Sequence, residues 1–458
     1  MSTASRRLAL WVSCVAQLTV VLDISVVNVA LPSIRADLAL DAVAATWVAM
    51  AYGLGFAGAL LVGARLADVL GTARVLGWGI ASFTLASAVG GLATEGWMLI
   101  GARVAQGLSA AVVSPATFTL LTTAHPEGPV RVRAVAVWTA VSLAGGGLGT
   151  IAGGVLTDLI SWRAVLLVNL PIGAAVALGA MTLRRWTPDD RRGGRVSPAG
   201  AVLATGGFTC ATYALSIAGT PGSALAFGAA AAASVLLFAL LVVEQRRTPH
   251  RLVPIELLRD RLIVWGNIAT ALTAVCFQVG LWYFLTFRMQ GRLGYTPMQA
   301  GLAFLPLTLA MLVVNTWATP RLMRRFRGRT LVRAGAAVAV LGLVWPAWAD
   351  SGAFVLTILV PSVVVGVGGG LLNTPLATIV TTGVPAERAG AASGLMNTGK
   401  QFGGAVGLAA ATAVAAGAGT DRAAFLLMAA ALGAVAVLAL RMPGRRGESV
   451  PVSDAPAR

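Results

Sequence analysis

Charged side chains are scarce in this sequence. Only 11% of the 458 residues are Asp, Glu, Lys or Arg, whereas 57% are hydrophobic and the mean hydropathy is +0.83. A soluble domain needs far more polar surface, so this composition predicts an integral membrane protein. The formal net charge of +17 comes from basic residues that lie between apolar runs rather than on one element. It therefore does not indicate a nucleic-acid partner.

Residues that build metal and catalytic sites are also few. The two histidines, His125 and His250, lie in separate loops, and Cys14, Cys210 and Cys276 lie inside apolar runs. Neither a metal-ligand spacing nor a disulfide framework can be read from these positions. A membrane-embedded transferase would need acids or histidines clustered near one interface, and the sequence shows no such cluster. We therefore expect no catalytic residues, no metal, no cofactor and no enzymatic activity.

The sequence has a single lysine, Lys400, which completes a G-x-x-x-x-G-K pattern in GLMNTGKQ, residues 394–401. A phosphate-binding loop follows a strand and continues with Ser or Thr, whose hydroxyl holds magnesium. Here Gln401 follows, and the segment runs on into an apolar helix. We interpret the match as coincidental and expect no nucleotide-binding site.

Fourteen apolar runs are long enough to cross a bilayer. They begin near Leu8, Ala44, Val75, Trp97, Val132, Ala164, Ala199, Ala224, Leu262, Met298, Leu331, Phe354, Ala389 and Ala423. An even number of spans places both chain ends on one side. The segments on that side hold 27 basic residues against 5 in the opposite loops. The positive-inside rule then predicts that both termini lie in the cytoplasm. We expect a multi-pass protein of the cell inner (plasma) membrane.

The runs divide the chain into four parts. Residues 1–183 form an N-terminal six-helix half, residues 184–261 two inserted helices with polar flanking loops, and residues 262–442 a C-terminal six-helix half. A tail, residues 443–458, is expected to be disordered. Within the halves, the pair Gly153-Gly154 recurs 250 residues later as Gly403-Gly404. The expected fold is therefore all-α, with 6+2+6 transmembrane helices in two pseudo-symmetric halves.

The first run, residues 8–31, holds Asp23, the only carboxylate deep inside an apolar run. A charge at that depth costs about 2.5–3.5 kcal/mol on insertion scales, so it marks a candidate functional site. Burial favours the protonated form of a carboxyl group and a nearby cation favours the ionised form, so alternating surroundings would take up and release a proton. The alternative is an acid that only faces a water-filled cleft. Pro32 is expected to end this helix.

The fourth run places Arg103, Gly107, Ala110 and Ser114 on one helix face, with Gln106 beside them. An arginine keeps its charge, so within a membrane it needs a partner, a water-filled cavity or backbone carbonyls. The alternative is an arginine that only ties helices together.

The fifth run carries glycines at four-residue spacing, which lets two helix backbones approach closely along one face. These glycines and one neighbour are Gly145, Gly149, Gly153 and Gly154. Glycines are common in spans, so the spacing alone does not settle their role.

With these motifs the sequence resembles the major facilitator superfamily, specifically its fourteen-helix drug:proton antiporter branch. The resemblance covers nearly the whole chain and includes the segments LDISVVNVALP, SWRAVLLVNLPIG and GLMNTGKQFGGAVG. It implies that Asp23 handles protons or a cationic substrate and that Arg103 takes part in proton transfer. It also implies that the glycine series of the fifth helix supports antiport.

The loop between the second and third runs follows the family pattern only in part. It keeps Asp68 and Gly71, which we expect to act in conformational change. The family has basic residues at positions that are here occupied by Val69, Thr72 and Ala73. The conformational latch that the resemblance implies is therefore expected to be weaker or to use Arg74.

We expect a proton-coupled exporter, a drug or antibiotic:H+ antiporter that moves small hydrophobic compounds by alternating access. Its partners would be the substrate, protons and the lipid bilayer, and it would act as a monomer. The candidates for the substrate cavity are polar or aromatic residues within spans: Asn28, Tyr52, Gln106, Gln278, Tyr283, Asn397 and Lys400. Aromatic residues near span ends also serve as interface anchors. The alternative function is export of an endogenous metabolite or siderophore; the glycine series argues, by resemblance, against import.

Overall fold

The protein is an all-helical bundle. The computed structural model describes residues 3–126, 128–184, 198–218, 222–248, 257, 259–348, 354–381, 384 and 386–442. Within these residues fourteen segments are long and apolar enough to cross a membrane, and there is no strand. The predicted all-α membrane fold is therefore confirmed. The tail at residues 443–458 lies outside the described residues.

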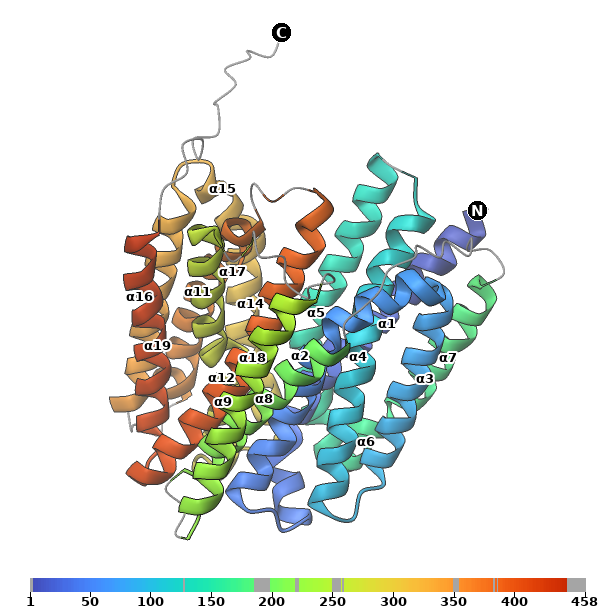
Figure 1. Cartoon of the computed structure of the whole chain (residues 1–458). Helices are drawn as coiled ribbons and strands as arrows, with labels where there is room; N and C mark the ends of the chain where they lie inside the picture. The colour runs from blue at the N-terminus through green and yellow to red at the C-terminus, as the bar shows by residue number, and fades with distance from the viewer. Residues whose placement is uncertain are drawn as a thin grey trace.

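The first six spans form one bundle, drawn in blue to teal in Figure 1. Its helices are α1 (Thr3–Asp37), α2 (Ala42–Leu70), α3 (Thr72–Gly91), α4 (Gly96–Ala124), α5 (Pro129–Leu159), α6 (Trp162–Leu167) and α7 (Asn169–Leu183). Helices α6 and α7 together make the sixth span. The span is interrupted just before Pro171, which lacks the backbone N–H that would continue the hydrogen-bond ladder.

The last six spans form a second bundle, drawn in yellow to red in Figure 1. Its elements are α11 (Arg261–Phe277), α12 (Gly280–Phe287), η1 (Arg288–Arg292), α13 (Pro297–Ala303), α14 (Leu305–Val313), η2 (Val314–Ala318), α15 (Thr319–Met323), α16 (Gly328–Trp348), η3 (Val355–Leu359), α17 (Val360–Thr381), α18 (Ala386–Ala418) and α19 (Arg422–Arg441). The three η segments are π-helical turns, which widen a helix and often occur at functional sites.

Two further helices lie where the bundles meet. Helix α8 (Pro198–Ile217) packs against α9 (Ala224–Arg247), α2 and α18, and Figure 1 shows this green pair across the front of the junction. On α9 the one buried residue is Ser234, so most of this apolar helix faces outward. An apolar helix with so little buried surface is suited to contact with lipid.

The predicted repeat between the halves is visible in the packing. A Cβ atom built on Gly153 would lie 2.7 Å from the carbonyl oxygen of Val26 on α1. One built on Gly403 would clash with the carbonyl oxygen of Ala271 on α11. Each half therefore uses a glycine of α5 or α18 to bring that helix against its own first helix.

Helix α1 continues past Pro32 to Asp37, so the expectation that Pro32 ends the helix is wrong. Proline removes its own backbone donor from the ladder, and its ring crowds the carbonyl group four residues earlier, but neither effect prevents the next turn from forming. The next turn is fixed because Ile34 is fully buried and its carbonyl accepts the Leu38 N–H at 3.0 Å. Tertiary packing thus outweighs the local effect of the proline.

The bundle has two distinct ends. Because the number of spans is even, α1 begins and α19 ends on the same side, here called the termini end, and the opposite side is the far end. Near the far end the Tyr283 and Thr46 hydroxyl oxygens lie 3.4 Å apart, and the Gln290 amide donates to the Val29 carbonyl at 2.8 Å. Contacts between the halves therefore close the far end.

Candidate functional site

Asp23 and Arg103 form an ion pair inside the N-terminal half. The Arg103 Nη1 atom donates to Asp23 Oδ2, which joins α1 to α4. Both residues are only 1% exposed. The structure therefore places the two charges that sequence analysis singled out in direct contact, out of reach of solvent. A buried pair of this kind is retained only when further hydrogen bonds satisfy the remaining polar atoms.

Two neutral side chains, Gln106 and Asn169, supply such hydrogen bonds, and a third, Ser87, holds those two in place. The amide nitrogens of Gln106 and Asn169 each donate to Asp23 Oδ1 at 2.9 Å, and the Gln106 carbonyl oxygen accepts from Arg103 at 2.9 Å. The Ser87 hydroxyl oxygen accepts from Gln106 at 2.8 Å and from Asn169 at 3.2 Å. The carboxylate thus has donors from α4 and α7, and α3 holds those donors in place.

The guanidinium of Arg103 also lies over an aromatic ring. Its Cζ atom is 4.7 Å from the centroid of Tyr52, close enough for a cation–π interaction. The Tyr52 hydroxyl donates to the Val20 carbonyl at 3.1 Å, which fixes the ring between α1 and α2. Within the described structure the Arg103 Nε and Asn169 Oδ1 atoms have no hydrogen-bond partner. The cluster therefore keeps one unused donor and one unused acceptor.

The glycine helix α5 packs directly behind this cluster. Gly149 faces the backbone of Leu22. A Cβ atom built on Gly149 would lie 2.9 Å from the Leu22 carbonyl oxygen. On another side of α5, a Cβ atom on Gly154 would lie 2.5 Å from the carbonyl oxygen of Pro297, which belongs to the other half. The glycines of α5 thus allow close contact with α1, which carries Asp23, and with α13 of the C-terminal half.

A central cavity lies between the halves. Its larger part, of about 220 Å³, is lined by Val21, Ser142, Gly146, Phe277, Trp282, Leu307, Thr308, Met311, Leu312, Asn315 and Asn373. A smaller part, of about 80 Å³, shares Phe277, Met311 and Asn373 with it and reaches Lys400 on α18. Residues of α1 and α5 face residues of α11, α12, α14 and α17 across this space.

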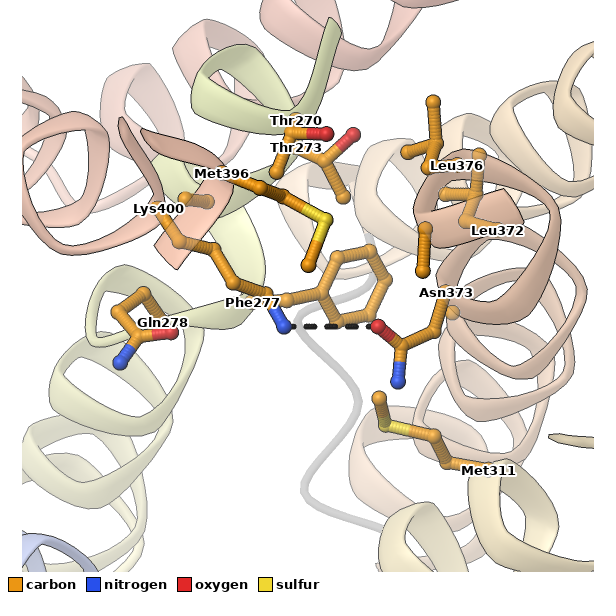
Figure 2. Close-up of a pocket in the computed structure, with 13 residues that line it drawn as sticks. Thr270, Thr273, Phe277, Gln278, Met311, Leu372, Asn373, Leu376, Met396 and Lys400 are labelled. Carbon is orange, nitrogen blue, oxygen red and sulfur yellow. Dashed lines mark hydrogen bonds between the residues drawn. The ribbon is translucent and has the colours of Figure 1, made fainter. Parts of the chain in front are cut away.

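Lys400 is a charged residue of the cavity wall. Figure 2 shows its side chain extending beside Phe277 toward Asn373, whose carbonyl oxygen accepts a hydrogen bond from Nζ at 3.4 Å. Gln278 lies on the same wall and donates to the Gln401 side chain at 2.9 Å. Most of the remaining surface is apolar, so the cavity suits a largely hydrophobic compound with a few polar groups.

The structure distributes the predicted cavity residues over several places. Gln278 and Lys400 line the smaller part of the cavity. Gln106 and Tyr52 belong to the Asp23 cluster, and Tyr283 lies at the contact that closes the far end.

The other predicted positions lie elsewhere on the same helices. Asn28 is buried on α1, 4% exposed, and Asn397 is partly buried on α18. Gly71 separates α2 from α3 with a φ of 90°, a conformation that favours glycine. A Cβ atom built on Gly145 would lie 3.2 Å from the Val21 side chain. The Asp68 side chain lies outside the described residues, so its expected role stays a prediction.

Sequence reasoning did not single out Asn169, Ser87, Asn373 or Asn315. Each is a polar residue inside an otherwise apolar span, which is a weak signal because such residues often satisfy their own helix backbone. Their roles depend on partners in other helices, such as the Thr374 hydroxyl that donates to Asn315 at 2.9 Å.

A family model and two similar known proteins indicate the same family for this chain. A family model described as Major Facilitator Superfamily matches residues 13–185 and 172–408. The chain is 45% identical to the cephamycin export protein CmcT of Amycolatopsis lactamdurans over 92% of this chain and 87% of that protein. It is 37% identical to the puromycin resistance protein pur8 of Streptomyces alboniger over 88% of this chain and 80% of that protein.

Solved structures share the fold at low sequence identity. A peptide transporter, POT, crystallised with alafosfalin, superposes with a TM-score of 0.68 at 14% identity and covers 94% of this chain and 93% of its own. The human organic anion transporter MFSD10 superposes with a TM-score of 0.63 at 15% identity, over 96% of this chain and 100% of its own. These likenesses establish the fold alone.

Proposed function

This chain belongs to the major facilitator superfamily, and we propose that it exports small hydrophobic compounds, such as drugs or antibiotics, in exchange for protons. The names of the relatives, an export protein and a resistance protein, support export as the direction. In this proposal the protein acts as a monomer in the cell membrane, with both termini in the cytoplasm.

The observation that carries the proton coupling is the buried Asp23–Arg103 pair. Protonating Asp23 removes the negative charge that balances Arg103, and leaves a cation that must find new partners or water. The Asn169 Oδ1 atom has no hydrogen-bond partner within the described residues. If the Asn169 amide group rotates, this oxygen can accept a hydrogen bond from the protonated carboxyl group of Asp23. The protonated and ionised forms of Asp23 therefore favour different arrangements of α1, α4 and α7.

The closed far end fits one step of such a cycle. With the termini in the cytoplasm the far end faces outward, and its closure keeps the central cavity from the outside. Asp23 is paired with Arg103 as expected of the ionised form, after a proton has left toward the cytoplasm. This conformation is therefore the one that takes up substrate, and α5, packed on both halves, is placed to transmit the change.

The energy available is sufficient for export without a nucleotide. Moving one charge through the membrane potential yields ~2.3 kcal/mol per 100 mV. One proton moving down roughly 150 mV therefore supplies about 3.4 kcal/mol, enough for a substrate gradient on the order of 300-fold.

The test is transport in inverted membrane vesicles that contain the full chain. Uptake of cephamycin, of puromycin and of neutral hydrophobic compounds is measured with and without an imposed proton gradient, together with proton release. We expect gradient-dependent uptake that Asp23→Asn abolishes while ligand binding persists.

The matched control is Asp37→Asn, which removes an exposed acid from the same helix, where it pairs with Arg163 at 2.7 Å. It should leave uptake within about twofold of the parent. If Asp23→Asn transports as well as the parent chain, Asp23 is not the coupling acid and the proposal is wrong.

A further inference from the structure

The charge of the cavity wall limits which compounds the cavity accepts. Among the described residues that line its two parts, Lys400 alone carries a charge. Within that part of the chain its hydrogen bond goes to the neutral amide of Asn373, and it forms no ion pair. An ammonium group at this depth in a membrane is rare unless it has a functional partner.

The acid that could attract a cation is not available to the cavity. Asp23 is 1% exposed, its two carboxylate oxygens receive hydrogen bonds from Arg103, Gln106 and Asn169, and it lines neither part of the cavity. No Asp or Glu is among the described residues that line either part of the cavity. A positively charged ligand would therefore meet Lys400 without a compensating carboxylate.

We propose that the exported compound carries a carboxylate or similar anionic group, which Lys400 binds in the smaller part of the central cavity. This proposal rests on the proposed export function and specifies its substrate class. At 3.4 Å the bond from Lys400 to Asn373 is long, and an anionic oxygen makes a shorter and stronger bond to an ammonium group.

The surroundings of Lys400 fit the rest of such a ligand. Phe277 and Met311 border both parts of the cavity, and Trp282 lines the larger part. These side chains supply an apolar wall for an aromatic or alicyclic body next to the charge. The Asn373 amide group also borders both parts, where its N–H groups can donate to the same anionic oxygens.

The test measures binding rather than transport, so it does not depend on the proton coupling. Purified full-length protein is titrated by calorimetry with benzoate, 2-naphthoate and 1-pyrenecarboxylate, each beside its primary amide and the corresponding arylmethylammonium ion. We expect at least one carboxylate to bind about 10-fold or more tightly than its amide, and the ammonium ions to bind more weakly than the amides.

Variants identify the source of the preference. Lys400→Gln should reduce the carboxylate-to-amide ratio to within about twofold while amide binding persists, which also shows that the variant is folded. Lys400→Arg should keep the ratio. Arg246→Gln removes one positive charge from an exposed position on α9 and should leave the ratio unchanged.

Three results would overturn the proposal: no carboxylate preference in any pair, a preference for the ammonium ions, or a carboxylate preference that survives Lys400→Gln. Proton-coupled uptake can fail in vesicles while the preference for carboxylates holds. The preference can also be absent while proton-coupled uptake is observed. A failure of the substrate-class proposal can therefore be told apart from a failure of the proposed export function.

Discussion

The buried Asp23–Arg103 pair should make a measurable contribution to the stability of the protein. Arg103→Met removes the guanidinium and leaves a buried carboxylate with two amide donors, Gln106 and Asn169, each at 2.9 Å. Removing one partner of a buried ion pair costs 3–5 kcal/mol. Because two donors to the carboxylate remain, we expect about 3 kcal/mol for Arg103→Met.

The double variant with Asp23→Asn tests whether this cost comes from the pair. Once the carboxylate is also neutral, no charge is left without a partner, so the double variant should be more stable than the sum of the single effects by about 2 kcal/mol. Reversible unfolding in detergent at pH 7, followed by tryptophan fluorescence, gives the four free energies of unfolding that the cycle requires.

A second ion pair on the same helix provides the control. Asp37 and Arg163 are 2.7 Å apart at the far end, with side chains 46% and 35% exposed. Exposed pairs contribute 0.2–1 kcal/mol, so Asp37→Asn with Arg163→Gln should show a coupling no larger than that. If the effects of Asp23→Asn and Arg103→Met simply add within about 0.5 kcal/mol, the two residues do not act as a pair and the reasoning on this site is refuted.

Three further substitutions test the helix contacts and the cavity. Gly153→Ala places a methyl group 2.7 Å from the Val26 carbonyl oxygen, so it should lower the free energy of unfolding by about 1–3 kcal/mol. Its control is Gly228→Ala on α9, where the added methyl group meets open space. In the same unfolding assay this control should be neutral or slightly stabilising. Trp282→Ala removes a ring from the larger part of the cavity and should raise KM for vesicle uptake several-fold; an unchanged KM would show that this wall does not contact substrate.

Much of the architecture could be predicted because membrane spans are encoded locally. Fourteen apolar runs predict fourteen spanning helices, and the structure confirms that number within its described residues. The same reasoning identified Asp23 and Arg103, since a charge inside an apolar run is visible without knowing its neighbours. The prediction that Pro32 ends α1 is wrong because it uses the local sequence alone. Burial of Ile34 in the tertiary structure stabilises the helix beyond the proline.

The composition of the site could not be predicted because it depends on contacts between helices. Asp23 and Arg103 are 80 residues apart, and Asn169 is 146 residues from Asp23. Gln106 was expected in the substrate cavity but lies in the Asp23 cluster, since one turn of α4 presents Arg103 and Gln106 to the same carboxylate. Helix periodicity gives the face of a residue but not the neighbour that the face meets.

Because the sequence has a single lysine, a reagent that reacts with primary amines can report on the central cavity. Apart from the α-amino group, Lys400 Nζ is the one primary amine of the chain, and it lies on the wall of the central cavity. An amine-reactive reagent therefore labels the interior at a known position without any engineered residue. The rate of labelling by a reagent added on one side of the membrane therefore measures how often the cavity opens to that side.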